Sequence, residues 1–271
     1  MSKELQRLQR VLFVQTAVLA FVMVYLSVRA AQLLVGTVGA WITVAAVAVL
    51  AVHSVSTQRL LLPAGTRRLE LSDAPELYWE LSLLCNRAGL QNVPPVYLIP
   101  SRQALAFTTG VGSGAFLVVS RGLVDSLGSP ELRAVLAHEV SHIRNHDLPL
   151  FALVGAMQRV TRLVAGVLLL LVLVGFPLLM MGLLVIPSRA LLYLGVVPLV
   201  SLFTQMALLR TREFQADLGA ADLTGDPIAL ARALHIIDSQ QRGLWDLRRP
   251  AQMLRTHPGT GERIERLRRL V

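Results

Sequence analysis

Two uncharged apolar runs near the N-terminus, residues 11–28 and 32–55, place the strongest constraint on the fold of this chain. A helix needs about 20 apolar residues to cross the hydrocarbon core of a bilayer. Two more apolar runs, 163–186 and 190–209, are separated only by a short turn around Ser188. A secretory signal peptide explains the first run poorly, because a second run follows closely and no small-residue cleavage site separates them. We therefore expect four membrane spans, arranged as two helical hairpins.

Composition agrees with a chain that lies largely in lipid. Hydrophobic residues make up 54% of the sequence and charged residues 16%, whereas an average soluble domain carries about 25% charged residues. The net charge is +9. The basic residues flank the apolar runs rather than alternating with aromatic residues, so we expect a lipid bilayer as a partner and no nucleic acid. Cys85 is the single cysteine, which excludes an intrachain disulfide and a zinc cluster of thiolates.

The placement of lysine and arginine predicts the orientation of the spans. Basic residues flank the outer ends of both hairpins, whereas the two hairpin turns carry only Arg29 and Arg189. Because positive residues stay on the cytoplasmic side, we expect both termini and the segment 56–162 to face the cytoplasm. This pattern predicts a multi-pass protein of the plasma (inner) membrane. The basic flanking residues are Lys3, Arg7, Arg10, Arg59, Arg67, Arg68, Arg159, Arg162, Arg210 and Arg212.

The segments outside the spans are predicted to form a mainly helical domain with a small β-sheet. Short strands are expected at 96–99, 104–109 and 116–120, since these runs are rich in β-branched and aromatic residues. Ser72 and Asp73 are expected to cap a first helix that Gly89 ends. Ser129 is expected to cap a second helix that has Pro130 at its first position and runs through His146. A third helix is expected to begin at Asp226-Pro227, and a basic terminal helix is expected at 259–270.

These elements predict an α+β integral membrane protein. The predicted layout comprises a cytoplasmic N-terminal tail (1–10), a first transmembrane hairpin (11–55), a first cytoplasmic part (56–162), a second hairpin (163–209) and a second cytoplasmic part (210–271).

The second predicted helix carries the sequence His138-Glu139-Val140-Ser141-His142. Residues four apart lie one turn above each other on the same helix face, so two imidazoles can bind one zinc ion. Glu139 lies beside them and can accept a proton from water. His146 continues the row but has rotated by about 80° around the helix from His138. We therefore expect His146 to be a solvated residue and not a ligand.

A catalytic zinc needs a third protein ligand, and Glu213, directly after the fourth apolar run, can supply it. Asp217 lies one turn later and can accept the remaining N–H of a ligating histidine. The alternative is that both carboxylates only neutralise Arg210 and Arg212 at the membrane boundary. The residues alone leave these two interpretations open.

The His-Glu-x-x-His motif is followed by Asn145 and Asp147 and then by Arg212-Glu-x-x-Ala-Asp217. This pattern resembles the HtpX-type membrane zinc endopeptidases, a family that includes the CAAX-prenyl proteases. The resemblance covers nearly the whole chain. It implies a zincin domain of the gluzincin type with one Zn²⁺ bound by His138, His142 and Glu213. It further implies that Glu139 is the catalytic base and that Asp217 orients a ligand.

Two further regions match the family less directly. Thr256-His257-Pro258 and Arg263 match a C-terminal pattern whose histidine and arginine would stabilise the oxyanion of the transition state. The alternative places Arg263 in an ordinary basic run with Arg266, Arg268 and Arg269. Gln103, Ala104, Leu105 and Ala106 replace the family's Asn-Ala-Phe-Ala strand. This strand would bind an extended polypeptide at the edge of the sheet, and Gln103 puts the position of the amide in doubt.

The resulting expectation is a membrane-bound zinc endopeptidase that hydrolyses polypeptide substrates, chiefly membrane or misfolded proteins, in protein quality control. A protease acting within the bilayer is disfavoured, because charge is costly at bilayer depth and the motif is surrounded by Glu131, Arg133, Arg144 and Asp147. Two alternatives remain: a protease that processes CAAX-type prenyl-proteins, and a non-catalytic membrane scaffold with a vestigial metal site.

Overall fold

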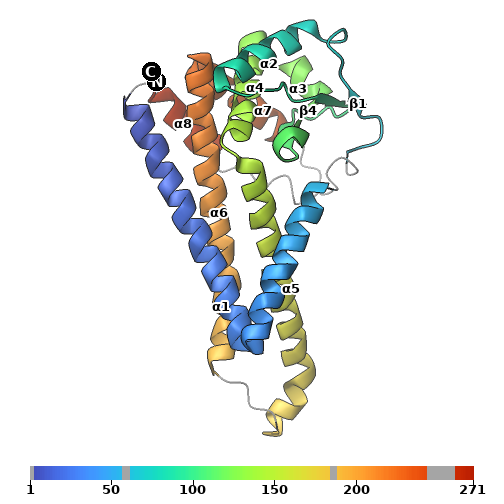
Figure 1. Cartoon of the computed structure of the whole chain (residues 1–271), viewed down its shortest axis with the longest axis vertical. Helices are drawn as coiled ribbons and strands as arrows, with labels where there is room; N and C mark the ends of the chain where they lie inside the picture. Colours follow the sequence, from blue (N-terminus) through green and yellow to red (C-terminus); the bar gives the residue numbers. More distant parts are fainter. Residues whose placement is uncertain (1–2, 57–61, 184–187, 243–259) are drawn as a thin grey trace. The chain divides into compact units, whose positions relative to one another are not determined.

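The computed structural model describes residues 3–56, 62–183, 188–242 and 260–271, which fall into two compact units (Figure 1). The first unit comprises Met1–Leu12, Val55–Leu150 and Leu209–Val271. The second comprises Phe13–Ser54 and Phe151–Leu208. Three long helices each contribute residues to both units: α1 (Lys3–Ser56), α5 (Asp147–Met180) and α6 (Ser188–Thr224).

The helices of the second unit have the length and apolarity that membrane spans need. Among the described residues, three stretches qualify: Arg10–Arg29, Gly36–Ser54 and Asp147–Gly166. The first two match the predicted runs 11–28 and 32–55. Gly36 has φ 74° and interrupts α1 between them, a backbone conformation that glycine adopts at little cost. The predicted third run, 163–186, begins inside α5, and its last residues lie outside the described ranges.

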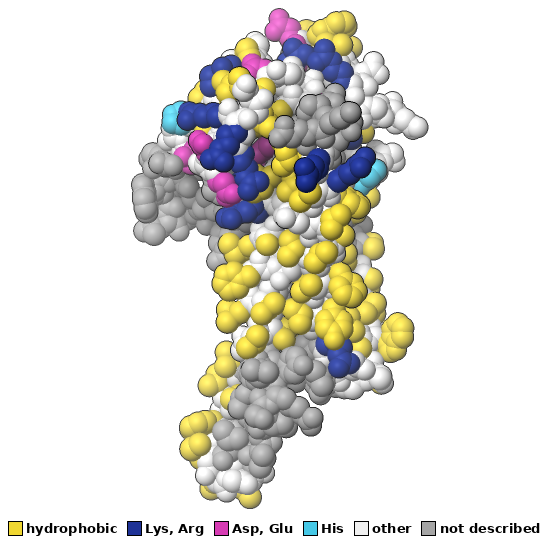
Figure 2. Space-filling model, turned by 90° about the vertical axis from the view of Figure 1, so that its left-hand side faces the viewer, with side chains coloured by type: hydrophobic (Ala, Val, Ile, Leu, Met, Phe, Trp, Pro, Cys, Tyr) yellow, Lys and Arg dark blue, Asp and Glu magenta, His cyan; other side chains and the backbone are white. Residues whose placement is uncertain are grey.

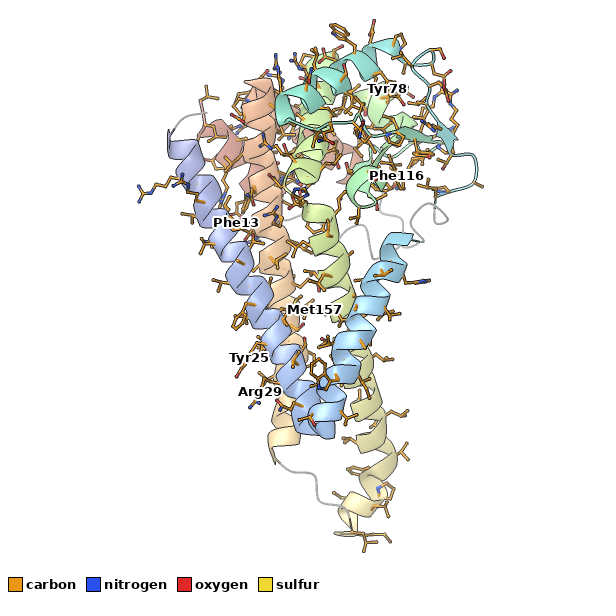
Figure 3. All side chains as sticks on the ribbon, viewed as in Figure 1. Phe13, Tyr25, Arg29, Tyr78, Phe116 and Met157 are labelled. Atoms are coloured by element: carbon orange, nitrogen blue, oxygen red, sulfur yellow. The ribbon has the colours of Figure 1, made fainter. Side chains whose placement is uncertain are left out.

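The outer surface of the second unit is apolar, as contact with lipid requires. Figure 2 shows hydrophobic side chains spread over its helices, and Phe21 and Trp41 are 70% and 74% exposed. Tyr25 points outward from α1 in Figure 3, whereas Met157 on α5 is buried. Inside the unit, the Ser201 hydroxyl donates to the Gln158 side chain at 3.2 Å. Hydrogen bonds of this kind hold helices together where water is absent.

The first unit contains a four-stranded mixed sheet in the order β1-β2-β4-β3. Its strands are β1 (Arg67–Arg68), β2 (Val96–Ile99), β3 (Ala106–Thr109) and β4 (Phe116–Ser120). The central pair, β2 and β4, is parallel, whereas each edge strand pairs antiparallel with its neighbour. The predictions for β2 and β4 are confirmed.

Strand β3 is shorter than the predicted 104–109. The Ser120 side chain accepts a hydrogen bond from Leu105 N–H at 2.9 Å and donates to the carbonyl of Gln103 at 2.7 Å. The Ser120 N–H still donates to the Leu105 carbonyl at 2.9 Å, but the Ser120 hydroxyl takes the place of the backbone acceptor for Leu105 N–H, so the regular ladder begins only at Ala106.

Helices α2 (Pro75–Ala88), α3 (Arg121–Ser126), α4 (Ser129–Arg144), α7 (Pro227–Arg242) and α8 (Thr260–Arg268) complete the first unit. They share one hydrophobic core with the sheet. Its fully buried side chains come from α2, β2, β4, α3, α4, α7 and α8 and include Leu81, Leu84, Val96, Leu117, Leu123, Leu136, Leu230 and Leu267.

The helix ends correct two expectations about capping. Helix α2 has Ala74 at its N-cap, because the Asp73 carboxylate accepts the N–H of Glu70 and is engaged in its own turn. Helix α4 has Gly128 at its N-cap in place of Ser129. The prediction that Gly89 ends α2 is confirmed, with φ 73°.

Helix α4 also ends earlier than predicted. Its last residue is Arg144, with Asn145 as the C-cap, and His146 has φ 55°. A left-handed residue cannot continue a right-handed helix. The chain therefore turns at His146 and begins α5 at Asp147.

Candidate metal centre

Helix α4 places His138, Glu139 and His142 in the interior of the first unit. Their exposed fractions are only 4%, 5% and 5%. The Nε2 atoms of the two histidines lie 3.2 Å apart, as the four-residue spacing on a helix predicts. The face of α4 that carries the histidines is therefore turned inward rather than toward water.

Helix α6 brings Glu213 to the same point. Its carboxylate oxygens lie 3.5 Å from His138 Nε2 and 3.6 Å from His142 Nε2. All ten residues from 211 to 220 are buried, so the approach of α6 to α4 is a packed contact. The three side chains form the one cluster with metal-binding potential found among the described residues.

Two buried aspartates determine which ring nitrogen of each histidine faces this point. Asp147 Oδ2 lies 2.7 Å from His142 Nδ1, and Asp217 Oδ1 lies 3.0 Å from His138 Nδ1. A carboxylate accepts the Nδ1–H of a neutral imidazole, which leaves the lone pair on Nε2. Two lone pairs at 3.2 Å repel each other unless a proton or a metal cation lies between them.

The donor set and its spacing fit zinc. A tetrahedral ion with bonds of about 2.0–2.1 Å separates its ligand atoms by roughly 3.4 Å. The three observed separations, 3.2, 3.5 and 3.6 Å, lie around this value. Two imidazole nitrogens and one carboxylate are also donors that zinc prefers. These residues can therefore hold a metal ion after only small side-chain adjustments.

The acidic groups favour positive charge at this point. Burial lowers the pKa of His138, but hydrogen bonds to Asp217 and Glu213 outweigh this effect and raise the pKa to about 9. The same two carboxylates would stabilise a bound cation for the same electrostatic reason.

Arg263 on α8 holds the two carboxylates of α6. Its Nε and Nη2 atoms donate to Asp217 at 2.8 and 2.6 Å, and Nη1 lies 3.0 Å from Glu213 Oε2. The guanidinium is 3% exposed. Burial raises the pKa of Asp217, but the Arg263 charge and the hydrogen bonds from His138 and Arg263 outweigh it and keep that pKa below its ordinary value. Asp217 is therefore ionised and able to orient His138.

Glu139 is positioned from the sheet. Thr108 on the edge strand β3 donates its hydroxyl hydrogen to Glu139 Oε2 at 2.8 Å. A threonine contact with this glutamate is absent from the predictions, because the residues lie on different elements and form no local motif. The contact links the edge strand directly to the predicted base.

Asp147 and its partner Arg212 are also missing from the predicted site. Arg212 forms a buried ion pair with Asp147 and donates to the carbonyl of Asn145 at 3.0 Å. The available signal was an aspartate five residues after His142. This spacing predicts a contact between Asp147 and His142 only if the helix ends between the two residues. The left-handed backbone of His146 ends the helix there.

The other predicted residues are placed as follows. His146 is exposed and outside the cluster, as expected. Gln103 is exposed and Ala104 buried just before β3, whereas Leu105 and Ala106 are half-buried at its start. His257 lies outside the described residues.

Comparisons with known proteins agree on one family. The sequence profile of peptidase family M48 matches residues 72–271. A "Protease HtpX homolog" from Acaryochloris marina is 36% identical over 227 residues, which cover 73% of each chain. A protein of the same name from Acidiphilium cryptum is 32% identical over 257 residues, or 80% of this chain and 81% of that one.

A similarity in fold comes from the crystal structure of S. mikatae Ste24p, with a TM-score of 0.54 and 21% identity. The alignment covers 96% of this chain and 66% of that one. Together with the apolar helices and the buried His/Glu cluster, these matches show that the chain is a membrane-bound metalloprotease and belongs to peptidase family M48.

Proposed function

We propose that this protein is a zinc-dependent endopeptidase of the plasma (inner) membrane, which cleaves membrane or misfolded proteins in quality control. The observation that carries the proposal is the convergence of His138, His142 and Glu213 from two helices, with Glu139 beside them. His138, His142 and Glu213 would hold one zinc ion. Zinc supplies Lewis acidity, which makes water a nucleophile near neutral pH.

Glu139 acts as the general base and then as the general acid. It follows His138 directly on α4, and its carboxylate is buried, so the group works out of contact with bulk water. It accepts the proton of the attacking water and delivers it to the leaving amine. The hydrogen bond from Thr108 holds one carboxylate oxygen and leaves the other for this transfer.

Arg263 and Asp217 keep the site ordered. Asp217 fixes the ring of His138, and Arg263 fixes both Asp217 and Glu213. A guanidinium carries five N–H groups, and these contacts with Asp217 and Glu213 need only three of them. Since Nη2 also lies 3.4 Å from His138 Nε2, the second N–H of Nη1, together with His257, would donate to the oxyanion that develops on the scissile carbonyl.

The substrate is an extended polypeptide bound along β3. In the described part of the sheet, this strand lies at an edge, with β4 on its other side. A peptide can add there by backbone hydrogen bonds, guided by Gln103, Ala104, Leu105 and Ala106. Backbone pairing selects unfolded segments more than particular side chains, which suits damaged membrane proteins.

The topology that we propose has four spans, with both termini and the catalytic segments in the cytoplasm. Two of the stretches with the required length and apolarity, Arg10–Arg29 and Gly36–Ser54, match the first two spans, and the third and fourth spans are the apolar runs 163–186 and 190–209. The excess of arginine at the outer ends of both hairpins supports the orientation.

The test compares two glutamates on the same helix. Glu139→Gln should bind one zinc per chain but lose cleavage of an unfolded membrane protein by about 10²–10⁴-fold. Glu131→Gln is the matched control, because Glu131 pairs with Arg232 at 2.7 Å away from the metal site. If Glu139→Gln cleaves as fast as the control, the proposed base is wrong. If only a prenylated CAAX peptide is cleaved, the substrate class is wrong.

A further inference from the structure

A cavity in the first unit is lined by residues of α1, α6, α7 and α8. Its volume is about 690 Å³, within the range of about 300–1,000 Å³ that ligand pockets occupy. Most of its wall is apolar, with Leu12, Phe214 and Leu218 in mutual contact as one buried cluster. The other large apolar residues of the wall are Leu8, Leu267 and Leu270.

The polar residues of the wall give it a positive charge, because both of its aspartates are paired with arginines. Asp217 is neutralised by Arg263, and Asp222 lies 3.6 Å from Arg144. Arg266 and Arg269 also line the cavity. The Arg266 guanidinium lies 3.7 Å from the centre of the Phe214 ring, which places a positive charge directly at the apolar wall.

Both arginines can exchange their present partners for a phosphate. Arg266 pairs with Glu262 at 3.1 Å and Arg269 with Glu265 at 3.2 Å. All four side chains are at least 41% exposed, and exposed pairs of this kind contribute little. A guanidinium binds a phosphate through two parallel hydrogen bonds, which are stronger.

The chain itself connects this cavity with lipid. Leu12 lines the cavity and also belongs to the candidate membrane span Arg10–Arg29. Arg7 and Arg10 are exposed on the same turns of α1. Basic residues next to a span attract anionic phospholipids, so the expected ligand has an apolar chain and an anionic headgroup.

We propose that this cavity is a binding site for an anionic phospholipid such as phosphatidylglycerol. One acyl chain fills the apolar space between α1, α6 and α8, and the phosphate binds Arg266 and Arg269.

A lipid bound in the cavity would stabilise the metal centre. Phe214 follows Glu213 on α6, Leu218 follows Asp217, and Arg266 lies three residues after Arg263 on α8. A chain packed against these residues holds α8 against α6, and with it the contacts of Arg263 to Asp217 and Glu213. The effect on cleavage rests on the proposed function, whereas lipid binding does not.

The experiment uses the full chain in dodecylmaltoside, in the Glu139→Gln background, titrated with soluble dioctanoyl lipids. Phosphatidylglycerol should raise the thermal unfolding midpoint, and the concentration needed should be at least fivefold lower than for phosphatidylcholine. The reason is that each basic residue near an anionic lipid increases the affinity by about fivefold. Inorganic phosphate at the same concentrations should give no shift. A shift with phosphate alone, or equal shifts with both lipids, would overturn the proposal.

Two pairs of variants test the two parts of the site. Arg269→Gln should raise the phosphatidylglycerol concentration needed by about fivefold, whereas Arg121→Gln, an equally exposed arginine paired with Asp125, should not. Ala221→Trp fills the cavity and should abolish the response, whereas Asn86→Trp on exposed α2 surface should leave it unchanged.

A second cavity variant keeps the test decisive if Ala221→Trp does not fold. Leu270→Asp changes a cavity residue that is 37% exposed, so the core is preserved, and it should also abolish the response. A normal response in a folded cavity variant contradicts the site. In the chain that retains Glu139, absence of cleavage together with a normal lipid-induced shift of the unfolding midpoint contradicts only the proposed function.

Discussion

Replacing Asp147 by Asn tests the most buried contact of the metal centre. Asp147 is 0% exposed and accepts from His142 Nδ1 at 2.7 Å while it pairs with Arg212. Asparagine has the same shape but only one acceptor oxygen. Whichever way the amide turns, its NH₂ group faces either the Nδ1–H of His142 or the guanidinium of Arg212, and two donors meet.

Two separate losses follow from this change. Loss of a hydrogen bond that orients a metal ligand typically lowers metal affinity by about 10–100-fold. Leaving Arg212 buried without its counter-charge should lower the free energy of unfolding by about 3–5 kcal/mol. Metal affinity is measured by competition with a chelator of known affinity, and unfolding by urea titration in detergent of the metal-free chain.

A double variant separates the two losses. Asp147→Asn with Arg212→Gln removes the unpaired charge, so it should regain part of the stability but not the metal affinity. Asp125→Asn is the control, because its carboxylate is 66% exposed and pairs with Arg121 at 3.7 Å; it should change stability by less than about 1 kcal/mol. Wild-type metal affinity in folded Asp147→Asn would refute the assigned orientation of His142.

Three further predictions concern the stability of the first unit. Leu81→Ala removes a fully buried side chain and should cost about 2–5 kcal/mol in urea unfolding, whereas a cost below 1 kcal/mol would contradict the core. Gly110→Ala should destabilise the β3–β4 turn, measured by faster proteolysis there, because φ is 93° and the new Cβ would meet Gly114 O at 2.3 Å. The hydrogen bond with Arg232 lowers the pKa of Glu131, so its contribution to stability is present at pH 7 and is lost as the pH falls through that lowered pKa; the unfolding midpoints of the native chain and Glu131→Gln should converge in acid.

The residues of the metal cluster were predictable because their spacing is local. His138, Glu139 and His142 lie within two turns of one helix, so a helical pattern fixes their geometry. Glu213 lies on a different helix, and its place depended on the resemblance to a known family. The structure brings all four together.

The contacts that the sequence did not reveal depend on where the chain turns. If the helix had continued through His146 as predicted, Asp147 would lie further along the helix axis, away from the His142 ring. The observed stop at Arg144 instead brings Asp147 back to the His142 ring. Similarly, Asp73 satisfies the N–H of Glu70 and not the start of α2. Side chains with several local partners cannot be assigned to one of them from sequence alone.

The carboxylates and guanidiniums around His138 have a further consequence for metal selection. Four buried acids (Glu139, Asp147, Glu213 and Asp217) are opposed by two buried arginines, Arg212 and Arg263. With both histidines neutral, as metal ligation requires, the protein interior encloses two uncompensated negative charges, which one dication would neutralise. We therefore expect the charge balance of the interior to favour a divalent ion, and the imidazole and carboxylate donors to choose among the dications.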